Sequence, residues 1–300
     1  MPLIRVRIEI EVEEPQALPR YLFSPLRGMI GAALKRISCV ARSFESCSPC
    51  PLNQHCAYGY IFETPRPQEA DRLRLYPYLP HPFAIAPPFP PPESKSLSVG
   101  LVLVGRAIQY FPHLILAFEA IGKRGLGRKR VPFRILHIHD EFTGEELYRN
   151  GNLSPPALKK DFPPETAREV IFTTRTPLTL RYKGQIVTPQ NFSFHVLIRN
   201  LLRRLSALSY FHASRELTVD FKAFIARAEE VRILSQNLET ISFNRYSARR
   251  KQSMPLKGLW GRVVFSGVLD EFIPFLRLGE QVQVGKNTAF GFGAYQLDFS

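Results

Sequence analysis

The chain lacks any long apolar run, and its few cysteines are confined to one segment. Its longest apolar stretch, residues 107–118, is shorter than the roughly 18 residues that cross a membrane, and Pro112 and His113 interrupt it. The N-terminal residues enter an alternating strand pattern directly, without the pattern of a secretory signal. All four cysteines lie between Cys39 and Cys56, whereas a secreted disulfide scaffold spreads its cysteines more widely. We therefore expect a reducing compartment, the cytoplasm.

Acidic side chains are scarce and unevenly placed. The 300 residues include 40 Lys and Arg against 26 Asp and Glu, which gives a formal net charge of +14. Neither residues 170–215 nor residues 241–269 contain a single acid. Such an excess indicates a polyanionic partner, either nucleic acid or an anionic membrane surface. Because the chain has neither a membrane-spanning run nor a secretory signal, we expect nucleic acid and no membrane partner.

The order of apolar patterns predicts an α+β protein. Residues 4–12 alternate apolar and charged side chains, as a half-buried strand does, and a helix begins near Ser24, which we expect to be its N-cap. Two tandem ferredoxin-like (RRM-like) domains, with helices on one face of each antiparallel sheet, fit this order. The further predicted strands are 82–86, 97–106, 131–139, 170–182 (a strand or hairpin), 232–246, 256–266 and 294–299, and the further helices are 111–121, 192–211, 219–230 and 271–278.

Proline pairs and an Asn-Gly-Asn turn mark a boundary near residues 150–166. We therefore predict a first domain over residues 1–155, with the cysteine segment 39–56 inserted in it, and a second over residues 165–300. With 45% hydrophobic residues the chain can bury a core in each.

The helix predicted over residues 192–211 carries a basic stripe. His195, Arg199 and Arg203 follow at positions i, i+4 and i+8, opposite the apolar face. Like charges at this spacing repel by about 0.2–0.5 kcal/mol, so the stripe does not serve the helix itself. Phosphate contact explains the stripe, and a solvated helix face is the alternative.

Two further acid-free segments combine cations with other useful groups: residues 123–130 carry cations around two glycines, and residues 241–269 carry cations among aromatic rings. Cations neutralise phosphates while aromatic rings stack on unpaired bases, a combination suited to RNA. Tyr246 is the aromatic residue that we expect to be exposed, whereas Phe243 and Trp260 fit a core equally well. The RNA-binding candidates in these segments are Arg128, Lys129, Arg130, Arg245, Arg249, Arg250 and Lys257.

The four cysteines are spaced Cys39-x7-Cys47-x2-Cys50-x5-Cys56. Two residues between thiolates let both reach one tetrahedral metal, so the spacing predicts a structural zinc site that uses all four sulfurs. Four reduced structural thiols are the alternative. A thioredoxin-like redox pair is a weaker interpretation, because two more cysteines lie nearby and no strand leads into the motif.

The glycine-rich segment 285–293 lacks the phosphate-loop pattern, since Glu280 stands where its first glycine belongs. Gly-Lys-x-Thr-x-Phe-Gly-Phe-Gly near the C-terminus instead resembles the glycine-rich loop of the RAMP superfamily of CRISPR proteins. Residues 245–261 (Arg-Tyr-Ser-x-Arg-Arg-Lys-Gln-x-Met-Pro-Leu-Lys-Gly-Leu-x-Gly) resemble the segment that precedes this loop in the precursor-crRNA endoribonucleases, the sixth Cas family. Gly125-Leu-Gly-x-x-Arg-x-Pro-Phe and Arg27-Gly28-x-x-Gly31 also fit their pattern.

The resemblance implies two ferredoxin-like domains, binding of CRISPR repeat RNA, and cleavage without a catalytic metal. A ribose 2′-hydroxyl attacks the adjacent phosphate and leaves a 2′,3′-cyclic phosphate and a 5′-hydroxyl. It also implies RNA contacts at Arg27, Lys35, Gly291 and Gly293.

Such cleavage needs a base, an acid and cations near the phosphate. Many relatives carry a base histidine near the first helix, but residues 20–38 contain none, and Gln283 stands where relatives often have another. We predict His195 as the base, with Tyr246 and Lys286 orienting the RNA and stabilising charge. A structural role for His195 is the alternative. The alternative function is a non-catalytic RAMP subunit that holds guide RNA in a CRISPR effector complex; a zinc-dependent DNA-binding protein is weaker, since no helix-turn-helix pattern supports it.

Overall fold

The computed structural model describes residues 1–300 except 20, 42, 68–78, 91–92, 150, 160–161, 163–164 and 248–251. It divides into two compact units, each taken by itself below. Unit 1 comprises Met1–Lys160 and Ala207–Arg215, and unit 2 comprises Asp161–Ser206 and Glu216–Ser300. Among the described helices, none combines the length and the apolar character needed to span a bilayer.

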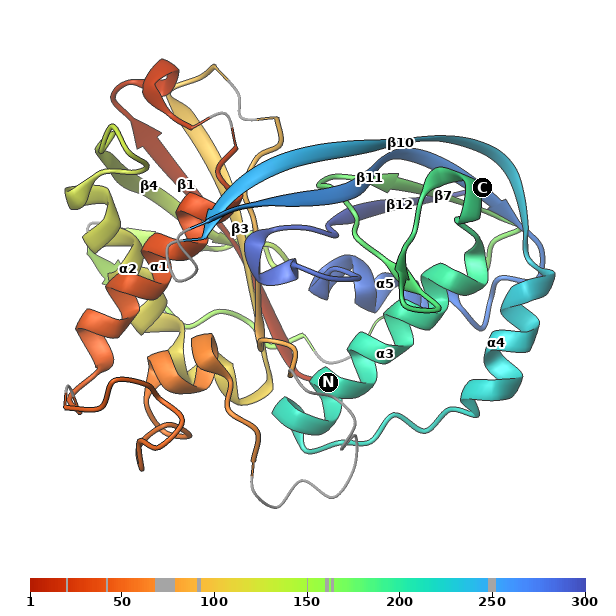
Figure 1. Ribbon diagram of the computed structural model, residues 1–300, viewed down its shortest axis with the longest axis horizontal. Helices are drawn as coiled ribbons and strands as arrows, with labels where there is room; N and C mark the ends of the chain where they lie inside the picture. The colour runs from red at the N-terminus through yellow and green to blue at the C-terminus, as the bar shows by residue number, and fades with distance from the viewer. Residues whose placement is uncertain are drawn as a thin grey trace. The chain divides into compact units, whose positions relative to one another are not determined.

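Unit 1 is built on a six-stranded sheet with the strand order β2-β3-β1-β4-β5-β6, in which neighbouring strands are antiparallel (Figure 1). The chain passes from strand to helix to two strands to helix to strand, and α1 packs against α2. This is the ferredoxin-like arrangement that the sequence predicts, extended at one edge by β5 and β6. The elements are β1 (Leu3–Val12), α1 (Phe23–Ser38), β2 (Phe83–Ala86), β3 (Ser96–Val104), α2 (Phe111–Arg124), β4 (Phe133–Asp140), β5 (Glu146–Arg149) and β6 (Asn152–Leu153).

The first strand and helix of unit 1 show what the local sequence decides. The alternating apolar side chains of β1 are all buried, as their period of two predicts. The expectation that Ser24 caps α1 is wrong, because the helix begins at Phe23 and Leu22 takes the N-cap position without a capping side chain. Leu22 and Phe23 are both buried, so the burial of two apolar residues sets the start of the helix instead of a cap.

Unit 2 repeats this topology with the sheet order β10-β11-β7-β12, again antiparallel throughout (Figure 1). The stretch predicted as a strand or hairpin over 170–182 is split: β7 ends at Thr174, and a separate two-stranded hairpin follows. The elements are β7 (Glu169–Thr174), β8 (Arg181–Tyr182), β9 (Gln185–Ile186), α3 (Phe194–Ala213, of which the part from Ala207 on belongs to unit 1), α4 (Phe221–Glu230), β10 (Arg232–Ser247), β11 (Gln252–Ser266), α5 (Ile273–Val282) and β12 (Tyr295–Phe299).

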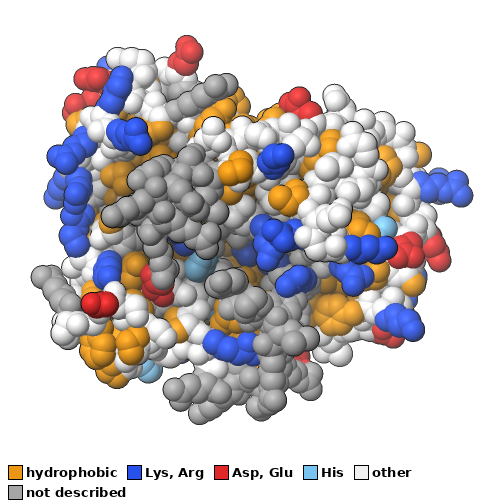
Figure 2. All heavy atoms as spheres, in the orientation of Figure 1, with side chains coloured by type: hydrophobic (Ala, Val, Ile, Leu, Met, Phe, Trp, Pro, Cys, Tyr) orange, Lys and Arg blue, Asp and Glu red, His pale blue; other side chains and the backbone are white. Residues whose placement is uncertain are grey.

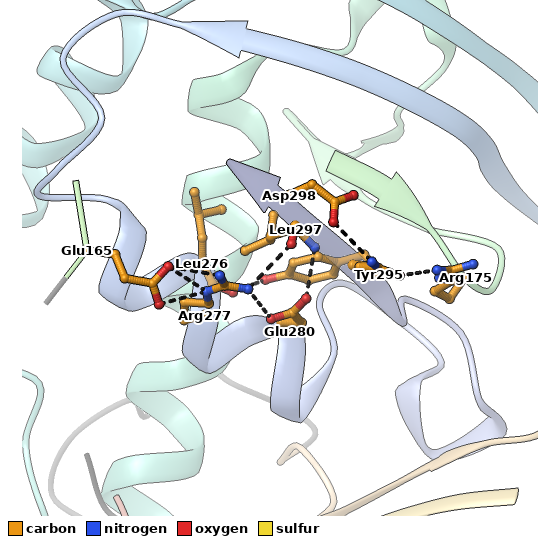
Figure 3. A network of polar contacts seen from close by, with 9 residues as sticks. Glu165, Arg175, Leu276, Arg277, Glu280, Tyr295, Leu297 and Asp298 are labelled. Atoms are coloured by element: carbon orange, nitrogen blue, oxygen red, sulfur yellow. Dashed lines mark hydrogen bonds and ion pairs between the residues drawn. The ribbon is translucent and has the colours of Figure 1, made fainter. Parts of the chain in front are cut away.

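A polar network fastens α5 to β12 in unit 2 (Figure 3). Arg277 donates to Glu165 at 2.8 Å and to Glu280 at 3.0 Å. Glu280 in turn accepts from the backbone N–H of Leu297 at 2.8 Å, and the Tyr295 hydroxyl donates to an α5 carbonyl at 2.6 Å. Because α5 and β12 are held together, the glycine-rich loop between them is anchored at both ends.

Candidate nucleic-acid interface

Unit 2 contains a cavity of about 710 Å³. Its walls come from the β8–β9 hairpin, the exposed side of α3, part of β11 and the start of the glycine-rich loop. Figure 2 shows Lys and Arg side chains gathered over the part of the molecule where α3 lies in Figure 1. Among the described residues that line the cavity there is no Asp or Glu, and the six cationic ones are Arg181, Lys183, Arg199, Arg203, Lys257 and Lys286.

The β8–β9 hairpin is held against α3 by one amide side chain. Asn200 accepts a hydrogen bond from the backbone N–H of Arg181 at 3.2 Å and donates to the Arg181 carbonyl at 3.0 Å. The two central residues of the turn, Lys183 and Gly184, have φ angles of 48° and 81°, as the tight hairpin turn matched to strand twist requires. The turn therefore places Arg181 and Lys183 on the wall of the cavity.

Thr179 joins two other walls of the cavity. Its carbonyl accepts from the backbone N–H of Lys286 at 2.8 Å, and its hydroxyl donates to the Lys257 carbonyl at 2.6 Å. Gly285 lies so close that a Cβ there would be 2.4 Å from the Thr179 carbonyl oxygen, and its φ is +88°. Only glycine fits this position, so the glycine serves the placement of Lys286.

The charges in the cavity oppose one another. Partial burial, together with the positive charges of Arg203 and Arg181, lowers the pKa of Lys286. Since no carboxylate among the described lining residues offsets this repulsion, an anion is the partner that would relieve it. Phosphate groups suit Arg and Lys donors, because charge-assisted hydrogen bonds to phosphate are short and strong. The cavity is therefore suited to a phosphate backbone.

Arg204, which belongs to the same acid-free segment, has a different role. It is buried, and its guanidinium donates to the Val282 carbonyl at 2.8 Å and 3.0 Å and to the Gln283 carbonyl at 3.1 Å. These carbonyls stand at the C-terminal end of α5, where they have no partner within the helix. Burial lowers the pKa of Arg204 to about 9, so the guanidinium keeps its charge at neutral pH.

His195, the base predicted from the sequence, is not among the described residues that line the cavity. It is half-buried in the first turn of α3, and its ring packs edge-on against Tyr182 with centroids 5.5 Å apart. Its Nδ1 lies 3.0 Å from the Ser193 hydroxyl, and within the described residues its buried Nε2 has no hydrogen-bond partner. These contacts fit the structural alternative at least as well as the catalytic one.

The remaining candidates of unit 2 lie on β10 and in the glycine-rich loop. Arg245 and Tyr246 pair with Met254 and Ser253 on β11, but their side chains, and Arg249 and Arg250 altogether, lie outside the described residues. Gly291 and Gly293 are buried and do not line the cavity. A Cβ at Gly293 would lie 1.9 Å from the Val284 carbonyl oxygen, so this glycine serves the fold of the loop.

The candidates of unit 1 fall into two groups. Arg27 and Lys35 lie on α1, where the Arg27 guanidinium lies 4.4 Å from the centre of the Phe62 ring and the Lys35 ammonium 5.5 Å from that of Tyr58. The second group is exposed in the turn between the bridged residues Leu126 and Val131, and consists of Arg128, Lys129 and Arg130.

The cysteine segment does not form a metal site among the described residues. Cys39, Cys47, Cys50 and Cys56 are thiols with partly exposed side chains. Burial raises the pKa of Cys47, and the neighbouring Glu63 raises it further. No described group of three or more His, Cys, Asp or Glu is placed to hold a metal ion, so the structure gives no support to the zinc site, which stays a prediction.

Four of the six cavity cations are site residues predicted from the sequence, whereas Arg181 and Lys183 are not. Both belong to the acid-free segment, yet their placement depends on the hairpin turn. The signal that could have located them is the glycine after Lys183, flanked by two short polar-apolar pairs.

Family models match both parts of the chain. Residues 1–160 match the model AF_1859_N, described as an N-terminal domain, and residues 172–295 match the model of the CRISPR-associated endoribonuclease Cas6. An uncharacterized protein of Archaeoglobus fulgidus is 26% identical over 302 residues, covering 97% of this chain and 96% of that protein.

Solved structures share the whole fold. A Cas6 product complex has a TM-score of 0.62 at 18% identity, covering 99% of this chain and 100% of that chain. A Thermus thermophilus Cas6 has a TM-score of 0.58 at 16% identity, with 99% and 98% covered. A RAMP protein that binds different RNA substrates has a TM-score of 0.52 at 11% identity, with 98% and 99% covered.

The chain thus has two ferredoxin-like units, and one of them has a cation-lined cavity beside a glycine-rich loop. The chain belongs to the domain family AF_1859_N by the match of residues 1–160, and its residues 172–295 are similar to the CRISPR-associated endoribonuclease Cas6.

Proposed function

We propose that this protein binds CRISPR repeat RNA and cleaves it within the precursor crRNA. The cation-lined cavity of unit 2 carries this proposal, because it offers six positive side chains to a phosphate backbone without a described carboxylate to repel it. The match of residues 172–295 to the Cas6 endoribonuclease model supports the cleavage step.

The proposed reaction uses no catalytic metal. The 2′-oxygen of one nucleotide forms a bond to the adjacent phosphorus while the bond from phosphorus to the 5′-oxygen breaks. The proton of the 2′-hydroxyl ends on the 5′-oxygen, and the products are a 2′,3′-cyclic phosphate and a 5′-hydroxyl. Lys286 and the arginines of the cavity would hold the RNA and offset its charge.

Incubation with the CRISPR repeat RNA of the host organism in EDTA tests this function. We expect one cut per repeat, with a cyclic phosphate on the upstream fragment. A repeat with a 2′-deoxy nucleotide at the cut should bind and stay intact, because it lacks the nucleophile. Cutting that depends on added metal would contradict the proposed mechanism.

A second candidate function is an RNA-holding subunit without catalysis. No histidine is found among the described residues that line the cavity, so the cavity alone offers phosphate binding and no neutral base. Tight binding of repeat RNA that stays uncut at every pH would select this function and exclude the nuclease.

A further inference from the structure

A second group of polar residues, far apart in the sequence, meets in unit 1. Arg27 lies on α1, Thr64 follows η2 (Gly59–Glu63), a single π-helical turn, and His81 precedes β2. The aromatic ring of Phe62 packs against two of these residues. The Arg27 guanidinium lies 4.4 Å from the centre of the Phe62 ring, and the centroids of the Phe62 and His81 rings are 6.4 Å apart. Gly31 permits this packing, because a Cβ there would be 2.4 Å from the Phe62 ring.

Two contacts of His81 indicate which of its ring nitrogens carries the hydrogen. An Nη of Arg27 lies 3.3 Å from His81 Nε2, and a guanidinium can only donate, so Nε2 accepts. Nδ1 then carries the hydrogen and donates to the Thr64 hydroxyl at 2.7 Å. The Thr64 hydroxyl donates a hydrogen bond to the Ile61 carbonyl at 3.0 Å. In this tautomer the Nε2 lone pair of His81 faces the Arg27 guanidinium.

The surroundings leave room for a ligand beside this pair. Gly28 follows Arg27 on the exposed side of α1, and no atom of the described residues lies within 4 Å of the place where its Cβ would be. A glycine inside a helix costs about 1 kcal/mol relative to alanine, and no neighbouring group in the described part of the chain explains Gly28 as Phe62 explains Gly31. Close approach of a bulky ligand would explain it.

We propose that His81 and Arg27 form the catalytic pair of the RNA cleavage, an inference that rests on the function proposed above. His81 Nε2 takes the proton of the ribose 2′-hydroxyl, the 2′-oxygen bonds to phosphorus, and the bond to the 5′-oxygen breaks. The proton passes from His81 through solvent to the 5′-oxygen, so no net water is consumed. Arg27, with five N–H donors, turns some of them to the phosphate and stabilises its added charge.

Thr64 acts as a positioning residue in this assignment. It is buried and adopts a left-handed conformation with φ of 50°, which is uncommon for a residue other than glycine. Holding the Nδ1 hydrogen of His81 keeps the lone pair on Nε2, as a hydrogen-bonded partner does for other functional histidines.

Single-turnover cleavage of repeat RNA by the full-length chain in EDTA tests the pair. We expect His81→Ala to slow cleavage by about 10²–10⁴-fold, the usual contribution of a general base, while the Kd for RNA changes by less than about threefold. Added imidazole should restore part of the lost rate. Arg27→Ala should slow cleavage by about 10²–10³-fold and imidazole should not restore it. His113→Ala, which removes another half-buried histidine of unit 1, is the matched control and should leave the rate within about threefold.

The results for the variants either support the catalytic pair or overturn it. Cleavage by His81→Ala at the wild-type rate would overturn the pair, and so would a loss that imidazole does not restore, since that marks a structural role. His81→Asn, which keeps a polar group near Thr64, replaces His81→Ala if the latter fails to fold. If the wild-type protein leaves every repeat RNA intact, the proposed function itself fails, and this result is distinct from any difference among variants.

Discussion

The cation-lined cavity makes a quantitative prediction about salt. Arg199 and Arg203 are exposed one turn apart on α3, and both line the cavity. Each phosphate contact to a single strand contributes about 0.7 to the slope of log affinity against log salt. Removal of both arginines should therefore reduce the slope by about 1.4. At about 0.1 M salt this corresponds to a loss of about 25-fold in affinity, or about 2 kcal/mol.

Fluorescence anisotropy with labelled repeat RNA, over a series of salt concentrations, measures this slope for the double variant Arg199→Ala/Arg203→Ala. The control Arg168→Ala/Arg232→Ala removes the same charge from exposed positions of unit 2 that do not line the cavity. We expect the control to keep the wild-type slope within its error. An unchanged slope in the first variant, or the same loss in both, would refute the assignment of the cavity to phosphate binding.

Three further predictions follow from single sites. Gly28→Ala should raise the free energy of unfolding by about 0.5–1 kcal/mol in urea titrations, because its Cβ meets no atom of the described residues. Gly31→Ala should lower the free energy of unfolding by about 1–3 kcal/mol, because its Cβ meets the Phe62 ring. Equal effects of the two substitutions would contradict this packing. Because the pKa of Lys286 is lowered, its ammonium should lose its charge, and RNA affinity should begin to fall, at a lower pH than an ordinary lysine pKa of about 10.4 would give. Lys286→Arg should move this loss of affinity to higher pH, because arginine stays charged. Identical pH profiles of the two proteins from about pH 8 upward would contradict this prediction. If zinc binds the thiols of segment 39–56, elemental analysis of protein purified without chelators should find about one zinc per chain, and its removal should unfold that segment alone; absence of the metal would refute the zinc site.

Periodic elements were accessible from the sequence. The strand over 4–12 and the long helix over 192–211 are found within two residues of their predicted ends, because burial of one face imposes a period of 2 or 3.6 on the residues themselves. The start of α1 could not be predicted from the sequence. Ser24 has the chemistry of a cap, but the burial of Leu22 and Phe23 decided where the helix begins.

Charge patterning located the site only in part. Arg199 and Arg203 follow from their spacing on one helix face, whereas Arg204, one residue further on, is buried against the end of α5. Helical phase predicts which side chains point outward, but it does not show which neighbour covers the other side. That neighbour is supplied by a segment nearly 80 residues later in the chain, as the separation of 78 between Arg204 and Val282 shows.

The sequence by itself determined the two α+β units, the resemblance to Cas6 and the acid-free segments, because strand and helix periods, short motifs and net charge are properties of neighbouring residues. The tertiary structure alone decided which cations share a cavity and which histidine faces an arginine. Arg27 and His81 are 54 positions apart, and no local pattern links them. Their contact exists because the strand order of the sheet and the packing of Phe62 on α1 bring distant segments together, and such contacts depend on the whole fold rather than on local sequence.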